Sequence, residues 1–314
     1  MIATNYMLLL HVELIYYIMI ALGLLLVVFL LYPFRINKDL PDIYPEKRFD
    51  ERNTMFSRKE LLPGSRKYLA YYANHPEHEL KDKAFRSEPG LLSHDSMFYH
   101  ERAFKEAQGY FSRVVKLHQA VAGKANPEKI KMSTAELTRK IKRFALDSGA
   151  LDTGIVRTKP YHFYSHKGRG TEYGKKIEIT YSYAIAFTVE MNHEMVQAAP
   201  QASIVLESAK QYLNAGNIAI RMAEMIRGMG YDARAHIDGN YQVICPLVAR
   251  DAGLGEIGRM GILMTPANGP RVRIGVVTTD MELQPDKYTR RNDVIDFCLM
   301  CKKCAVCCPG QSIP

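Results

Sequence analysis

Four cysteines near the end of the sequence follow the spacing C-x₂-C-x₂-C-x₃-C-P, and this run restricts the possible folds more than any other feature. Five of the six cysteines of the chain lie within eleven residues, and the motif consists of Cys298, Cys301, Cys304 and Cys308. The spacing is that of a bacterial-ferredoxin iron–sulfur site, in which the fourth cysteine ligates a second cluster. Zinc loops usually separate two cysteine pairs by a dozen or more residues, and disulfides between such close thiols would be strained. The run therefore predicts [4Fe-4S] ligation.

Two clusters need more ligands than this run contains. Each [4Fe-4S] cluster takes four cysteines, whereas residues 291–314 offer five in total. We interpret these residues as an incomplete ferredoxin-like iron–sulfur module and expect the sequence to be a piece of a longer protein. In this interpretation Cys298, Cys301 and Cys304 serve one cluster, Cys308 serves the other, and Cys307 is a bystander.

An uncharged apolar segment covers residues 14–34 near the N-terminus. At the helical rise of 1.5 Å per residue it is about 30 Å long, which matches the hydrocarbon core of a bilayer. The segment has neither the positive start nor the short apolar core of a signal peptide, and no twin-arginine motif precedes it. Residues 1–34 are therefore predicted to form a transmembrane anchor in contact with the lipid bilayer.

Basic residues follow this segment and none precedes it, beginning with Arg35 and Lys38. By the positive-inside rule, we expect a single-pass protein of the cell inner membrane with its globular part in the cytoplasm. Nucleic-acid binding is another explanation for the formal charge of +9. No DNA- or RNA-binding motif accompanies that charge, so no nucleic-acid partner is expected.

The rest of the chain mixes helical and strand patterns without a long alternating series, which predicts an α+β fold. Residues 35–130 are rich in proline but keep many aromatic side chains, so we expect an irregular N-terminal arm that wraps a core. Residues 131–290 are expected to form that core, and Ser133 and Glu136 form a capping box at its first helix. A long helix is predicted over 203–229. Strands are predicted over residues 155–156, 177–189, 233–237, 241–245 and 272–279.

Two further motifs match known sites only in part. His75 and His78 form an HPEH pair, but a metal site would need two more ligands that the sequence does not identify, so we interpret them as solvated or capping residues. The stretch GLGEIG at residues 253–258 matches the dinucleotide fingerprint, which requires a strand directly before the first glycine. Residues 246–252 are predicted to be a helical turn instead, so NAD binding is not expected.

The chain resembles the cobamide-dependent reductive dehalogenases in two segments, DAGLGEIGRMGILMTPANGPRVRIGVVTTDMEL and FCLMCKKCAVCCP. The resemblance continues upstream through YSYAIAFTVEMNHEMVQAAP, QYLNAGNIAIRMAEMIRGMGYDA and RNTMFSRKELLPGSRKYLAYYANHP. The family shares a superfamily with epoxyqueuosine reductase, which reduces an epoxide on a tRNA nucleoside. The N-terminal arm and the MNHEMVQAAP stretch are more similar to the dehalogenase branch.

This resemblance implies a nitroreductase-like core that binds a cobamide, a B12-type corrinoid, in its base-off form. It identifies Tyr212 as the proton donor above the cobalt and Arg271 as the cation beside it, with Arg273 as the competing residue. Such a cation would lower the pKa of a tyrosine by roughly 1–3 units. Asp238 or Asn240 is expected to line the pocket between them. The residues expected along the cobamide are Gly253, Leu254, Gly255, Gly258, Arg259 and Gly261.

The implied activity is reductive removal of halide from a small-molecule organohalide. Reduced cobalt breaks the carbon–halogen bond, Tyr212 supplies a proton, and two [4Fe-4S] clusters return electrons from an electron donor protein or a quinol. Two other functions remain open from the residues alone. One is an epoxyqueuosine-reductase-like reductase of a tRNA nucleoside, and the other is a non-catalytic, membrane-bound iron–sulfur electron carrier.

Overall fold

The computed structural model describes residues 2–32, 44–308 and 310–313, with side chains from residue 14 onward. The chain divides into two compact units, Met1–Pro41 and Asp42–Pro314, and each is described by itself. Several features used above lie outside the described residues. These are residues 33–34 of the apolar segment, the basic residues Arg35 and Lys38, and Pro309 of the cysteine motif.

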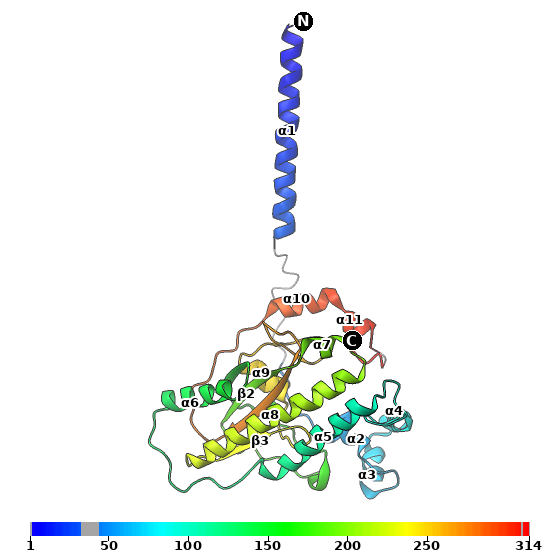
Figure 1. Cartoon of the computed structure of the whole chain (residues 1–314), viewed down its shortest axis with the longest axis vertical. Helices are drawn as coiled ribbons and strands as arrows, with labels where there is room; N and C mark the ends of the chain where they lie inside the picture. Colours follow the sequence, from blue (N-terminus) through cyan, green and yellow to red (C-terminus); the bar gives the residue numbers. More distant parts are fainter. Residues whose placement is uncertain (1, 33–43, 309, 314) are drawn as a thin grey trace. The chain divides into compact units, whose positions relative to one another are not determined.

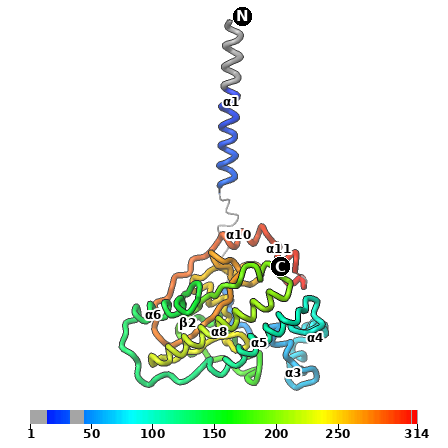
Figure 2. Tube along the Cα trace, in the orientation of Figure 1, coloured from blue at the N-terminus to red at the C-terminus, as the bar shows by residue number. Residues whose placement is uncertain are grey.

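The first unit contains one long helix, α1 (Ile2–Leu31), which Figures 1 and 2 trace from the N-terminus. Its stretch Leu14–Leu31 is long and apolar enough to cross a membrane, and none of these residues is buried against other parts of the chain. A signal sequence near the N-terminus of a chain can pass the same test of length and apolar composition. The helix is therefore either a membrane span or a signal sequence.

The second unit is built on a four-stranded antiparallel sheet with the order β1-β2-β6-β3. The strands are β1 (Asp152–Arg157), β2 (Tyr183–Glu190), β6 (Val272–Thr279) and β3 (Ala233–His236). The two central strands pair along their whole length, from Tyr183 opposite Thr279 to Glu190 opposite Val272. Since β2 is buried on both faces, its sequence is an apolar run without polar–apolar alternation.

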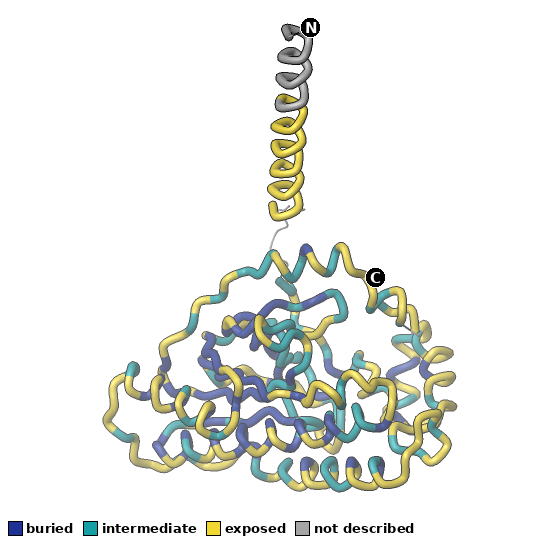
Figure 3. The backbone as a smooth tube through the Cα atoms, turned by 45° about the horizontal axis from the view of Figure 1, so that its top comes forward, coloured by how far each residue is buried: buried dark blue, intermediate teal, exposed yellow. Residues whose placement is uncertain are grey.

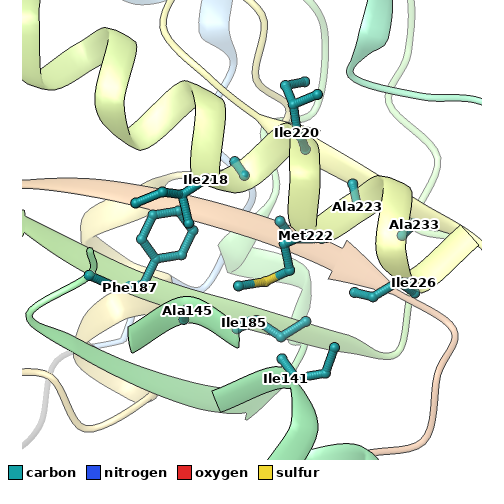
Figure 4. Packing of buried hydrophobic residues seen from close by; sticks show 14 of the residues in the cluster. Ile141, Ala145, Ile185, Phe187, Ile218, Ile220, Met222, Ala223, Ile226 and Ala233 are labelled. Atoms are coloured by element: carbon teal, nitrogen blue, oxygen red, sulfur yellow. The ribbon is translucent and has the colours of Figure 1, made fainter. Parts of the chain in front are cut away.

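Helices cover both faces of this sheet. On one face, α6 (Thr134–Asp147) and α8 (Ala202–Gly228) enclose a core that includes Ile141, Phe187 and Met222, as Figure 4 shows. On the other face, α9 (Cys245–Asp251) packs against the central strands. Figure 3 shows the buried residues concentrated at the sheet and along α8. The predicted mixture of helices and sheet is thereby confirmed.

The N-terminal part of this unit is largely helical, although the sequence was expected to form an irregular arm. Pro76 is the first residue of a helix, where the missing N–H of proline would have no intrahelical partner in any case. Proline there indicates a helix start rather than a loop. The elements are η1 (Glu51–Asn53), α2 (Met55–Lys59), α3 (Arg66–Asn74), α4 (Pro76–Ser87), α5 (Glu101–Leu117) and η2 (His118–Ala120).

The core follows the predicted elements closely and departs from them at two strands. The capping box of Ser133 and Glu136 is present at the start of α6. The strand predicted over 177–189 begins only at Tyr183. The strand predicted over 241–245 is wrong, because Cys245 begins α9 with a proline in its first turn.

The glycine-rich stretch is preceded by a helix, as the sequence predicted for residues 246–252, and its second half belongs to a short hairpin. That hairpin consists of β4 (Glu256–Ile257) and β5 (Leu263–Met264). The remaining elements are η3 (Pro160–His162), η4 (Gly170–Glu172), α7 (His193–Gln197), α10 (Asn292–Cys301) and α11 (Lys303–Val306).

Candidate functional site

A cavity of about 830 Å³ lies where the first half of α8 faces β6 and the helices of the N-terminal part. From α8 it is lined by Ile204, Ser208 and Tyr212, which are four residues apart, and then by Ala215 and Gly216. Residues at this spacing project from one face of a helix. Tyr212 is thus followed on this face by the small residues Ala215 and Gly216, which leave room in the cavity beside it.

Tyr212 and Arg273 form the most distinctive pair in this cavity. The Arg273 guanidinium lies 4.7 Å from the centre of the Tyr212 ring, and its Nη2 donates to Ser208 Oγ at 2.7 Å. The Nε of Arg273 is buried and has no hydrogen-bond partner among the described residues. Burial raises the pKa of Tyr212, and the positive charge of Arg273 opposes that effect. The pair therefore combines a phenol with a fixed cation, and the Nε–H of that cation has no hydrogen-bond partner among the described residues.

Arg271, which was expected beside Tyr212, lies elsewhere. Its Nη1 donates to Glu190 Oε1 and to the backbone oxygen of Met191, both at 2.6 Å. The described wall of the cavity includes Arg273 and does not include Arg271. The reason is that Arg271 precedes β6 and meets the end of β2, whereas Arg273 lies within the strand. The expected placement of Arg271 is therefore corrected, and Arg273 is the cation that contacts Tyr212.

Asp238, rather than Asn240, is the polar residue in the described cavity wall. Between them, Gly239 has a φ of 74°, a left-handed conformation that glycine adopts without strain. This turn directs the Asn240 amide toward the backbone oxygen of His118, at 3.2 Å. Burial raises the pKa of Asp238, although nearby cations such as Arg273 oppose the shift. Asp238 therefore adds a second acid to the cavity.

Other residues of the wall come from distant parts of the sequence, and sequence patterns did not identify them as site residues. Phe56 and Phe85 belong to the N-terminal helices α2 and α4 and close one side of the cavity. Cys245 lines the cavity as well, and burial raises the pKa of its thiol to about 12. Tyr241 also belongs to the cavity wall. Only the packing of the folded chain reveals the contribution of α2 and α4.

The glycine-rich stretch contacts the cavity at one point. All six residues expected along a cobamide are described, and among them Gly261 lines the cavity. Leu254 is part of the core on the α9 face of the sheet. A Cβ on Gly255 would overlap the backbone of Met264 in the paired strand. The need for glycine at position 255 thus comes from the β4–β5 hairpin itself.

The loop of this hairpin also reaches the cysteine run. The backbone N–H of Arg259 donates to Cys298 Sγ at 3.4 Å, and its Nε donates to the Cys298 backbone oxygen at 3.3 Å. A Cβ on Gly258 would lie 3.5 Å from the same sulfur. Since Gly261 is three residues further on and lines the cavity, one short loop contacts both features.

The cysteines of the run lie on two short helices and the segment that follows them. Cys298 and Cys301 belong to α10, Cys304 belongs to α11, and Cys308 comes after it. All are unpaired thiols, as cluster ligation requires. The Cys308 thiol and Ser312 Oγ share a hydrogen bond at 3.5 Å, and this contact lowers the pKa of the thiol. The donor chemistry fits an iron–sulfur cluster, and Cys298 is the cysteine in contact with the hairpin loop.

The cavity also has features that suit a large anionic or amide-bearing cofactor. The unpartnered Nε of Arg273 offers a hydrogen bond, and Gly261, at φ 74°, has open space where a Cβ would project. Gly253 and Gly255 are not part of the described cavity wall. Fewer residues of the glycine-rich stretch would therefore contact a cobamide than the sequence implied.

Comparison with known proteins agrees with the resemblance seen in the sequence, although no family model matches the chain. A tetrachloroethene reductive dehalogenase of Desulfitobacterium hafniense is 42% identical over 129 residues, which are 41% of this chain and 23% of that protein. A solved reductive dehalogenase, whose description concerns B12-dependent dehalogenation, has a TM-score of 0.59 at 28% identity, over 68% of this chain and 32% of its own. A catabolic reductive dehalogenase in complex with 3-bromo-4-hydroxybenzoic acid has the same TM-score and identity, over 66% and 30%.

This chain resembles the reductive dehalogenases in both sequence and fold. It spans about a quarter of the length of the curated reductive dehalogenases that it matches, and about a third of the solved ones. The activity of a whole reductive dehalogenase is therefore a proposal for this chain.

Proposed function

We propose that this chain is part of a membrane-anchored reductive dehalogenase that removes halide from an organohalide, with a nitroreductase-like core that binds a cobamide. The observation that supports this most is the cavity in which Tyr212 and Arg273 meet, beside a loop that contacts Cys298. A reductive cleavage needs a proton donor, a cation and a nearby route for electrons. In this proposal, Cys298 would ligate the cluster through which the electrons enter. The similar proteins suggest halogenated small molecules, such as a chloroethene or a bromophenol, as the substrate class.

The proposal assigns roles to Tyr212, Arg273 and the loop of Gly261. A reduced cobamide, when bound, supplies the electrons that cleave the carbon–halogen bond. Tyr212 holds a proton near neutral pH, because burial raises its pKa, and donates that proton to the carbon that loses the halogen. Arg273 stabilises the phenolate that remains, and its unpartnered Nε donates to the departing halide. Gly261 and its loop would contact the cofactor.

The finer assignments from the sequence remain part of the proposal. Cys298, Cys301 and Cys304 would hold one [4Fe-4S] cluster and Cys308 would serve the second, in a ferredoxin-like module. The hydrogen bond from Arg259 to Cys298 Sγ supports electron entry through the loop that leads to the cavity. Residues 1–34 would anchor the protein in the inner membrane, with the body in the cytoplasm and an electron donor protein or a quinol as partner.

The proposal is tested by anaerobic reconstitution of the full chain, in detergent, with iron, sulfide and a cobamide. Co-elution of corrinoid absorbance with the protein reports binding. Halide release from tetrachloroethene and from 3-bromo-4-hydroxybenzoic acid, with a chemical reductant, reports turnover. Iron–sulfur absorbance without any affinity for the corrinoid would favour the electron carrier instead.

Tyr212→Phe tests the proton donor, and Tyr110→Phe is its matched control. Arg113 lies over the ring of Tyr110 at 5.5 Å, as Arg273 does over Tyr212, but Tyr110 is not in the described cavity wall. Loss of a general acid should lower the rate of halide release by roughly 10²–10⁴-fold in Tyr212→Phe. Tyr110→Phe should keep the wild-type rate. Equal rates in the two variants would exclude Tyr212 as the donor.

A further inference from the structure

The corner between α3 and α4 brings together two histidines and a glutamate that the proposed function does not use. His75 is the last residue before α4, Pro76 begins the helix, and His78 lies in its first turn. The side chain of His75 makes no capping hydrogen bond to the helix, in contrast to the capping role considered from the sequence. Its imidazole is instead turned toward Glu77.

The three side chains converge at distances that suit metal ligation. Glu77 Oε1 lies 3.5 Å from His75 Nδ1 and 3.6 Å from His78 Nε2. Two ligand atoms at about 2.0–2.1 Å from a tetrahedral zinc ion are roughly 3.4 Å apart. Among the described residues, this is the one group of three His, Cys, Asp or Glu side chains whose ligand atoms all lie within 4.8 Å of one another.

A second observation concerns the tautomer of His78. The buried hydroxyl of Tyr71 donates its single proton to Asn53 Oδ1 at 3.1 Å. The Tyr71 hydroxyl oxygen also lies 3.1 Å from His78 Nδ1, and with its own proton directed to Asn53 it is placed to accept the proton of that nitrogen. His78 Nε2 is then the nitrogen with the free lone pair, and it faces Glu77. Metal-binding histidines are commonly oriented in this way, through a hydrogen bond from the other ring nitrogen.

The surroundings leave room for further ligands. His75 also lines a separate cavity of about 660 Å³, together with Asn53 and Tyr71. Three protein ligands with a fourth position open to water form the ligand set of catalytic zinc sites. From this arrangement we propose that His75, Glu77 and His78 bind one divalent transition-metal ion, for which Zn²⁺ is the probe. This site is independent of the proposed dehalogenase activity.

The test is isothermal titration of the metal-free full chain with ZnCl₂ in detergent. The thiols of the cysteine run are first alkylated with iodoacetamide, because thiolates would also bind zinc. The wild type should bind one more zinc ion than His78→Ala. Glu77→Gln keeps the shape of an exposed side chain and should weaken binding more than tenfold without affecting the fold.

Two variants separate a built site from adventitious binding. Tyr71→Phe keeps all three ligands and the buried ring but removes the hydroxyl that orients His78, so zinc affinity should fall by roughly 10–100-fold. His94→Ala removes an exposed histidine that lies 3.9 Å from a single carboxylate, that of Asp95, and should leave binding unchanged. Equal zinc stoichiometry and affinity in the wild type, His78→Ala and Glu77→Gln would overturn the proposal, and so would a wild type that binds no zinc after alkylation.

Discussion

Arg271 and Arg273 show how far sequence alone can resolve a site. Residues two apart in a strand share a face, so alternation left both as candidates for the cation beside Tyr212. The structure separates them through a partner that lies far away in the sequence, because Glu190 at the end of β2 binds Arg271. The structure also distinguishes Asp238 from Asn240, because the turn at Gly239 directs their side chains to different partners. No local pattern contains these long-range pairings.

Arg273→Gln should slow halide release more than Arg271→Gln does. Loss of the Arg273 charge leaves the Tyr212 phenol a weaker acid, since a neighbouring cation can lower a pKa by roughly 1–3 units, and we expect about a tenfold or larger fall in kcat. Arg271→Gln removes a partly exposed ion pair with Glu190 that lies outside the described cavity wall, so it should affect halide release little. The measurement is kcat against pH for both variants. A larger loss in Arg271→Gln would restore the assignment made from the sequence.

Asp238→Asn should change the pH dependence of stability. Burial raises the folded-state pKa of Asp238 above its unfolded value. The contribution of this carboxyl to stability is therefore fully present below the unfolded pKa, and it is lost as the pH rises through the folded pKa. Asn carries no charge, so the stability of Asp238→Asn relative to the wild type should increase from acidic to neutral pH. Urea unfolding at several pH values measures this, and a difference that stays constant with pH would contradict it.

At the scale of elements, long patterns were predicted well and short ones were not. The capping box placed the start of α6, and the apolar periodicity placed α8 within two residues at each end. The strand expected over 241–245 failed because the segment forms a single isolated bridge, from Val243 to Phe163, before Cys245 begins α9. The prolines of the N-terminal part were interpreted as loop signals, whereas Pro76 begins α4. Proline has both uses, and only packing against α2 and α3 distinguishes them.

Gly275→Ala should destabilise the central strand pair. Gly275 lies opposite Phe187 in the ladder between β2 and β6, and a Cβ at this position would overlap the Phe187 ring. Phe187 is fully buried, so the ring has little room to move. Overpacking of this kind costs about 1–3 kcal/mol of unfolding free energy, measurable by urea denaturation.

Two further variants define this effect. Phe187→Leu in the Gly275→Ala background should cost less than the sum of the two single changes, because the smaller side chain removes the overlap. Gly109→Ala on α5, where a Cβ would meet nothing within 4 Å, should instead stabilise the protein by about 0.5–1 kcal/mol. Additive costs for the first pair would show that the overlap is relieved in some other way.

For the whole molecule, the sequence predicted the separation of an apolar N-terminal helix from a folded body. The body has its own buried core on both faces of the sheet, and none of the α1 residues with described side chains, Leu14–Leu31, belongs to it. The core of the second unit, Asp42–Pro314, is thus built from that unit's own residues. The structure leaves two uses for α1, a lasting membrane span or a signal sequence that is removed.

These two uses of α1 predict different N-termini, and therefore different masses, for the expressed protein. If α1 is a lasting anchor, the intact mass includes the N-terminal residues, and the protein floats with lipid vesicles in a density gradient, because about 18 apolar residues suffice for the hydrocarbon core. A variant without residues 1–41 should remain folded, with an unchanged unfolding midpoint, and should stay at the bottom of the gradient. If α1 is a lasting anchor, the wild-type protein floats because α1 is inserted in the vesicle membrane. A wild-type mass that lacks the apolar helix would identify a signal sequence instead, and would place the body on the far side of the membrane from that predicted by the basic residues after α1.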